Sequence, residues 1–248
     1  MSAVEAIVKE NRHVTVHETA KCLDMSYGSA HHIVHDVLQF HKLSASWVLR
    51  QLTAELKERR VDACQELLKC FEAEGDGFLG RIVTGDETWV HYHQPETKKA
   101  SKDWRHTSLP KPKKFRTQSS VGEVMLPLIW DERGVLLEHY MPKGNTVTSA
   151  TYADLLKNYL CPAIKSKRHG LLITGVLLQH DNAWPHTACS TVPTIQDLSS
   201  ECLTHPPYSP DLTPSDFHVF GPLKEAMGGK PLRSDEAVQQ AVHEWLHC

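Results

Sequence analysis

Three aspartates have the residue type and the setting needed for chemistry on a phosphodiester. Asp86 lies in a segment rich in β-branched and aromatic residues, Asp181 directly follows an apolar run, and Asp216 opens an expected helix. Burying a carboxylate at the end of a strand is costly unless a metal ion or a reaction uses it. Carboxylate oxygens suit Mg²⁺ or Mn²⁺ better than zinc. Three converging carboxylates could hold two ions about 4 Å apart, one at the attacking and one at the leaving oxygen.

Each of these aspartates also has a purely structural explanation. Asp86 could belong to a turn, Asp181 to an Asx-turn, and Asp216 could be a charge favoured by the dipole at a helix N-terminus. Asp211 competes with Asp216, although its neighbours favour a role in capping the turn. Glu87 should point to the opposite strand face from Asp86, which makes it a weaker ligand candidate.

The histidines and cysteines do not form a recognised metal motif. None of the 17 histidines is joined to Cys or Glu in a spacing such as H-E-x-x-H, so surface and core positions are expected for them. The 7 cysteines are odd in number and lack C-x-x-C pairs. This pattern favours reduced thiols over a zinc ribbon or a disulfide framework.

A basic segment between residues 92 and 120 offsets the net charge of −3. A long basic loop suits contact with a phosphate backbone, and a merely solvated loop is the alternative. The expected DNA contacts in it are Lys98, Lys99, Lys102, Arg105, Lys113, Lys114 and Arg116. No apolar run approaches the roughly 20 residues of a membrane span, so a soluble protein without a membrane partner is expected.

Residues 1–40 read as three short helices, with a capping box at Thr15 and Glu18. Two helices joined by a tight turn are typical of a helix-turn-helix DNA-binding unit, and any small three-helix bundle is the alternative. In the helix-turn-helix geometry, the start of the second of these two helices would face a DNA groove. The residues expected there are Ser26, Tyr27, Ser29, His31 and His32.

The rest of the chain is expected to position the three aspartates. Residues 41–80 read as a helical linker, and residues 81–248 as an α/β domain with a mixed sheet. We expect a strand interrupted near Asp86, a hairpin of residues 124–130 and 135–140, and a central strand over the apolar run 171–179. Helices are expected at residues 148–164, 186–199 and 212–227, with a short strand at 202–204.

Three motifs resemble the catalytic motifs of mariner transposases, a family of the Tc1/mariner superfamily. They are TGDETW at residues 84–89, HDNAWPH at 180–186 and YSPDLTPSDFH at 208–218, and 34 residues separate Asp181 from Asp216. The resemblance implies a ribonuclease-H-like domain in which Asp86, Asp181 and Asp216 bind two Mg²⁺ or Mn²⁺ ions. It also implies a nuclear endonuclease that cuts double-stranded DNA at transposon ends, joins them to a target and works as a homodimer assembled on that DNA.

Several features depart from the family pattern. Only one helix-turn-helix unit is visible where two are usual, and the chain stops short of the usual C-terminus, so a core truncated at both ends is expected. Trp184 stands where the second motif usually has Arg, and Leu49-Arg50 replaces Pro-His in a linker motif at residues 47–53. The alternative function is therefore a domesticated or truncated relative that binds DNA or a partner transposase without complete transposition activity.

Overall fold

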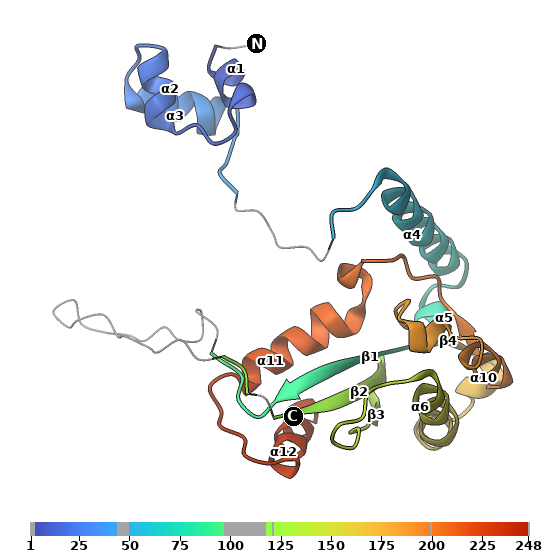
Figure 1. The fold of residues 1–248 in the computed structure, drawn as a ribbon. Helices are drawn as coiled ribbons and strands as arrows, with labels where there is room; N and C mark the ends of the chain where they lie inside the picture. Colours follow the sequence, from blue (N-terminus) through green and yellow to red (C-terminus); the bar gives the residue numbers. More distant parts are fainter. Residues whose placement is uncertain (1–2, 44–49, 97–117, 121, 199, 248) are drawn as a thin grey trace. The chain divides into compact units, whose positions relative to one another are not determined.

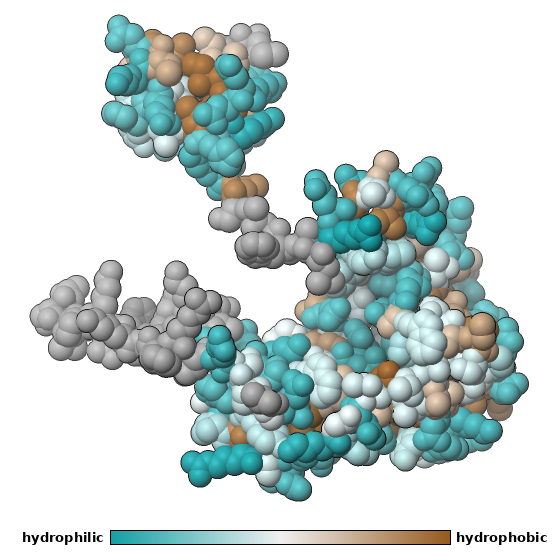
Figure 2. Space-filling model, in the orientation of Figure 1, coloured by the Kyte–Doolittle hydropathy of each residue, from teal (hydrophilic) through white to brown (hydrophobic). Residues whose placement is uncertain are grey.

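The computed structural model describes residues 3–43, 50–96, 118–120, 122–198 and 200–247. The chain divides into two compact units, Met1–Leu49 and Arg50–Cys248, and each is described separately below. Within the described ranges, no helix is long and apolar enough to cross a membrane. The visible surface is mostly hydrophilic, with small hydrophobic areas between the polar residues (Figure 2).

The first unit consists of short helices (Figure 1). Thr15 and Glu18 form the expected capping box, in which the Glu18 carboxylate accepts the Thr15 N–H at 2.7 Å. The apolar spacing of residues 27–38 predicts a single helix that buries Val37, but Val37 is exposed. The reason is a π-helical turn that rotates the end of this helix. The elements are α1 (Ala3–Glu10), α2 (Val16–Cys22), α3 (Tyr27–His32) and the π turn η1 (Ile33–Val37).

The second unit begins with the long helix α4 (Ala54–Glu74), whose N-cap is Thr53, and the short helix α5 (Asp76–Leu79). Its sheet has the order β3-β2-β1-β4-β5. β3, β2 and β1 are antiparallel, whereas β1, β4 and β5 are parallel, so the expected mixed α/β sheet is confirmed. The strands are β1 (Ile82–His91), β2 (Glu123–Asp131), β3 (Gly134–Glu138), β4 (Val176–Gln179) and β5 (Ser200–Cys202).

The helices of this unit are divided between two hydrophobic cores. One contains Val83 of β1 with Leu156 and Ile195, and the other contains Val90 of β1 with Leu223 and Val242. Val83 and Val90 differ by an odd number of positions, so they point to opposite faces of the strand. Figure 1 shows α6 (Ser149–Asp154) and α10 (Thr191–Asp197) toward one end of the unit, and α11 (Gly221–Met227) and α12 (Asp235–Leu246) toward the other.

Two strand predictions were wrong in detail. β1 runs without interruption through Asp86, because antiparallel pairing with β2 continues from Thr84 to His91. The apolar run 171–179 is not a single strand: it forms the short helix α8 (Leu171–Thr174) and then β4. Gly175, at φ 91°, adopts the left-handed conformation that lets the chain turn from helix into strand.

The expected helices are present but subdivided. The helix at residues 148–164 contains a π-helical stretch between its α-helical ends, and the one at 186–199 is two short helices. The helix α12 was not anticipated, although Ser234 caps it and its apolar residues Val238 and Val242 are fully buried. The elements are α6 (Ser149–Asp154), η2 (Leu155–Leu160), α7 (Cys161–Lys167), α9 (Trp184–Thr187), α10 (Thr191–Asp197), η3 (Pro210–Leu212), η4 (Ser215–Phe220), α11 (Gly221–Met227) and α12 (Asp235–Leu246).

Candidate active site

The parallel pairing of β1 with β4 sets two of the aspartates at one level. Thr84 of β1 is in register with Gln179, the last residue of β4. Asp86 follows Thr84 by two residues, and Asp181 follows Gln179 by two residues. Asp86 still lies within β1, whereas Asp181 lies just beyond the carboxyl end of β4, where polar residues of parallel strands gather at the sheet edge.

The third aspartate, Asp216, comes from the segment that covers the same side of β1. Asp86 and Val90 share a strand face, and that face carries the core to which Phe220 of η4 belongs. Trp130 of β2 donates its indole N–H to the Ser215 hydroxyl at 3.1 Å, which holds the start of η4 against the sheet. Gln179 donates its side-chain amide to the Leu212 carbonyl at 3.1 Å, so the end of β4 is tied to the same segment.

The three carboxylates influence one another electrostatically. Burial, followed by the negative charges of Glu87, Asp216 and Asp181, raises the pKa of Asp86 to about 7, although the Glu87 N–H bonded to its Oδ1 acts in the opposite direction. Burial also raises the pKa of Asp216, with the charge of Lys224 opposing and that of Asp181 reinforcing it. Such mutual repulsion is the condition that a bound divalent cation relieves.

Asp181 is held by a histidine that sequence reasoning did not single out. His186 Nδ1 lies 2.7 Å from Asp181 Oδ1, and its Nε2 lies 3.3 Å from Glu87. Burial would lower the pKa of His186, but its bonds to these two carboxylates prevail and raise it to about 10. His186 is therefore a cation that donates to both. The signal was its place in the HDNAWPH motif, five residues after Asp181.

The pKa of Asp181 shifts in the opposite direction from that of Asp86. Its burial favours a higher pKa, but the hydrogen bonds from His186 and from the Ala183 N–H, together with the charge of His186, leave the pKa below its ordinary value. Both hydrogen bonds go to Oδ1. Asp181 is thus held ionised and in a fixed orientation, while Asp86 is the carboxyl whose charged form is disfavoured by burial and by the neighbouring negative charges.

A buried aromatic layer supports His186 from behind. The rings of His180 and His186 stack with centroids 4.9 Å apart, and Tyr152 lies 4.3 Å from His186. The Tyr152 hydroxyl contacts His180 Nδ1 at 2.8 Å. Burial and the neighbouring positive charge of His186 lower the pKa of His180 to about 4. His180 is therefore neutral, and the only positive charge in this stack is the one that faces the carboxylates.

The three carboxylates suit a hard divalent cation. Among the described residues, the sole group of three whose ligand atoms all lie within 4.8 Å of one another is elsewhere, at Glu138, His243 and His247. The oxygen-only chemistry of the three aspartates fits the expected Mg²⁺ or Mn²⁺.

The helix α4 and Arg50, which precedes it, contact the third motif directly. Arg60 donates to both carboxylate oxygens of Asp211, at 2.9 and 2.8 Å, and this pairing lowers the pKa of Asp211. Arg50 bonds to the Tyr208 hydroxyl at 2.8 Å and lies over its ring. Asp211, considered above as a rival to Asp216, is instead the partner of an arginine. It fixes the turn five residues before Asp216.

The predicted DNA-contacting residues of the first unit are all exposed and are spread from the N-cap of α3 to its last turn. Ser26 is the N-cap of α3 and accepts the Ser29 N–H at 3.0 Å, so its hydroxyl is partly used within the turn. His32 is paired with Asp36 at 2.7 Å. Tyr27 and His31 are exposed, with ring centroids 6.1 Å apart. These side chains therefore span the whole length of α3 rather than its start alone.

The predicted basic contacts, Lys98, Lys99, Lys102, Arg105, Lys113, Lys114 and Arg116, lie outside the described residues. The two ends of their segment are described and lie together. Tyr92 donates its N–H to the Gly122 carbonyl at 2.9 Å, and Ser120 donates to the His93 carbonyl at 3.1 Å. The segment therefore leaves from the end of β1 and returns at the start of β2.

Comparison with known proteins identifies relatives along the whole chain. A family described as "Transposase (partial DDE domain)" matches residues 94–174. The Mariner Mos1 transposase of Drosophila mauritiana is 32% identical over 98% of this chain and 69% of its own length. The Homo sapiens histone-lysine N-methyltransferase SETMAR is 30% identical over 98% of this chain, which covers only 35% of that protein.

Solved structures agree with these sequence relatives. The Mos1 mariner paired-end complex with Mn has a TM-score of 0.81 at 32% identity, covering 98% of this chain and 70% of that one. The Mos1 Strand Transfer Complex has a TM-score of 0.80 at 32% identity, covering 99% and 69%. The Mos1 catalytic domain has a TM-score of 0.66 at 32% identity, covering 82% and 86%. With its ribonuclease-H-like mixed sheet and this similarity over nearly its full length, the chain belongs to the mariner family of DNA transposases.

Proposed function

We propose that this chain is the cleaving and joining core of a mariner-type transposase, acting on double-stranded DNA at transposon ends and at a target. The observation that carries the proposal is the mutual electrostatic influence of Asp86, Asp181 and Asp216, which come from β1, from the segment after β4 and from η4. The relative named as a paired-end complex with Mn, and another with Mg, supports a divalent cation as the cofactor.

Asp86, Asp181 and Asp216 are the proposed catalytic residues and ligands of two Mg²⁺ or Mn²⁺ ions. Bound there, divalent cations supply Lewis-acid stabilisation to the attacking and leaving oxygens of a phosphodiester. His186 is a positioning residue: it holds Asp181 through Oδ1, so the other carboxylate oxygen is the one available to a cation. Glu87 lies on the strand face opposite Asp86, and its hydrogen bond and negative charge help to keep His186 protonated.

DNA recognition is assigned to two regions. We propose that residues 1–40 form a helix-turn-helix unit that meets a DNA groove with Ser26, Tyr27, Ser29, His31 and His32, and that residues 41–80 link it to the catalytic domain, residues 81–248. The basic segment contacts phosphates through Lys98, Lys99, Lys102, Arg105, Lys113, Lys114 and Arg116. We also propose that the protein acts in the nucleus, as a homodimer assembled on DNA. Relatives solved as paired-end complexes, one of them with the left transposon end, support the assembly on DNA.

Nicking of supercoiled plasmid DNA in Mg²⁺ or Mn²⁺ tests the catalytic proposal. We expect Asp181→Ala to lower the rate by at least about 10³-fold, because one of three ligands is lost. Asp197→Ala is the matched control, since it removes an exposed carboxylate at the end of α10, and it should leave the rate unchanged. Equal cutting by the parent and Asp181→Ala would refute the assignment of this site.

A gel shift at increasing salt tests the DNA contacts separately. Each phosphate contact adds about 0.9 to the slope of log affinity against log salt, so neutralising three of the seven basic residues should reduce that slope by about 2–3. A slope unchanged by these substitutions would contradict the phosphate contacts. Salt-dependent binding without any nicking would instead favour a relative that binds DNA without complete transposition activity.

A further inference from the structure

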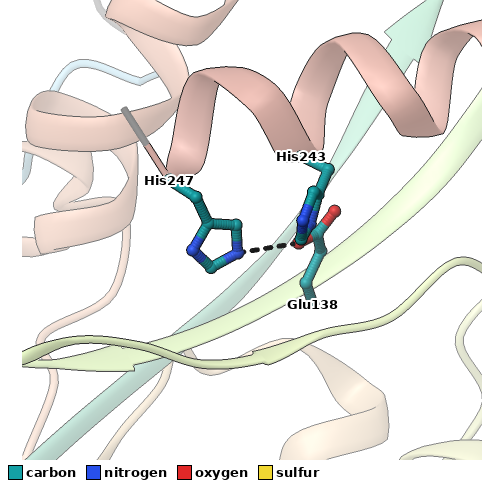
Figure 3. A group of neighbouring side chains, drawn as sticks. All are labelled: Glu138, His243 and His247. Carbon is teal, nitrogen blue, oxygen red and sulfur yellow. Dashed lines mark hydrogen bonds and ion pairs between the residues drawn. The ribbon is translucent and has the colours of Figure 1, made fainter.

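A second group of potential metal ligands lies apart from the three aspartates. Glu138 is the last residue of β3, and His243 and His247 stand four residues apart at the end of α12. His243 Nδ1 lies 2.9 Å from Glu138 Oε2, and His247 Nε2 lies 3.4 Å from the same oxygen. Figure 3 shows both rings descending from one helix toward the carboxylate of the strand beneath.

We propose that Glu138, His243 and His247 bind a Zn²⁺ ion that fastens α12 to the edge strand of the sheet. Two imidazoles and one carboxylate are a donor set that zinc accepts, with a water molecule in the fourth position. Histidines at positions i and i+4 share one face of a helix, which gives the two nitrogens a common direction. The hard cation expected at the aspartates prefers oxygen ligands, so the two sites differ in chemistry.

The separations suit a single ion. Tetrahedral ligands about 2.0–2.1 Å from zinc lie roughly 3.3 Å from one another. The two contacts of the histidine nitrogens with Glu138 Oε2, 2.9 and 3.4 Å, bracket that value, and all three ligand atoms lie within 4.8 Å of one another. His243 and His247 are 63% and 43% exposed, so their rings are free to close the remaining gap. The ion would replace the protons that the rings now share with Glu138.

The carboxylate is oriented in advance. Tyr140 donates its hydroxyl hydrogen to Glu138 Oε1, which leaves Oε2 facing the two rings. The Tyr140 hydroxyl also lies 3.2 Å from the Gln239 carbonyl of α12. Val238 and Val242 of the same helix are fully buried. Ligating carboxylates and histidines are usually held by such outer contacts, and here the ligands stand on two elements that a core already fixes.

A hydrogen-bonded cluster without any ion is the competing explanation, because histidine near a helix C-terminus is favourable in itself. Equilibrium dialysis of the full chain with Zn²⁺, in excess Mg²⁺ to occupy the aspartates, separates the two. We expect the parent to bind one more zinc per chain than His243→Ala/His247→Ala. At free zinc about 100-fold above its dissociation constant, the parent's Tm should rise by roughly 5–10 °C, and this rise should be lost in the variant.

Two further variants make the test specific. Glu138→Gln keeps the shape of the side chain and should weaken zinc binding at least about 10-fold. His31→Ala/His35→Ala removes another one-turn histidine pair, with centroids 4.3 Å apart, and should leave the extra zinc in place. Equal zinc stoichiometry in the parent and His243→Ala/His247→Ala, or no zinc in either, would overturn the proposal. His243→Ala/His247→Ala should leave plasmid nicking in Mg²⁺ unchanged, so the zinc test is independent of the proposed transposase activity.

Discussion

Replacing Arg60 by Met should impair DNA cleavage far more than folding. Arg60 lies on α4 and makes a two-pronged ion pair with Asp211, at 2.9 and 2.8 Å. Asp211 belongs to η3, which leads directly into η4 and Asp216. Loss of the pair frees this turn from α4 while leaving the hydrophobic cores intact, because Arg60 belongs to neither of them.

The two expected effects differ in size. The Asp211 side chain is 63% exposed, so water screens the pair and its loss should cost only about 1 kcal/mol of unfolding free energy or less. For a unit of this size, that lowers Tm by roughly 2–4 °C. Displacement of a catalytic group by about 1 Å can cost about 10²-fold in rate. We therefore expect nicking to slow by about 10- to 100-fold at saturating DNA, with the apparent DNA affinity little changed.

Arg59→Met is the matched control, because Arg59 neighbours Arg60 on α4 but pairs within the helix, with Glu55 at 2.6 Å. It should change neither Tm nor the rate by a measurable amount. Single-turnover nicking of supercoiled plasmid and thermal unfolding of the same samples provide the two readouts. If Arg60→Met cut DNA as fast as Arg59→Met, the view that α4 positions the third motif would be refuted.

Three further predictions concern stability. The Asp131 carboxylate is 2% exposed and bonded to Arg168 at 2.6 Å, so Arg168→Met leaves it buried without this ion pair. The substitution should cost about 3 kcal/mol or more of unfolding free energy and lower Tm by roughly 6–12 °C. A loss below about 1 kcal/mol would contradict this expectation. Thr15→Ala removes the cap of α2 and should cost about 1 kcal/mol, seen as roughly 5-fold faster amide exchange in α2. Burial raises the pKa of Asp86 from 3.8 to about 7, so the folded state binds its proton more tightly than the unfolded state and loses stability as pH rises between these values. Asp86→Asn should therefore raise the Tm of metal-free protein by a few degrees at pH 8 but not at pH 4, and an equal gain at both would exclude this charge as the cause.

Some elements could be read from the sequence because their local signals were strong. Thr15 and Glu18 predicted a capping box, and the hairpin turn between β2 and β3 falls where Asp131 to Gly134 predicted it. Predictions of continuity failed where a single residue or a tertiary contact decided the outcome. Gly175 divides an apolar run into helix and strand, and β2 keeps β1 paired past Asp86.

By itself, the sequence determined the three aspartates, their motifs and the family, because these depend on residue types at fixed intervals along the chain. Only the tertiary structure decided what surrounds them. The parallel register sets Asp181 level with Asp86, His186 is drawn between Asp181 and Glu87, and Asp211 becomes the partner of an arginine 151 positions away. Such contacts join residues from separate elements, and each pKa shift depends on burial that no local pattern specifies.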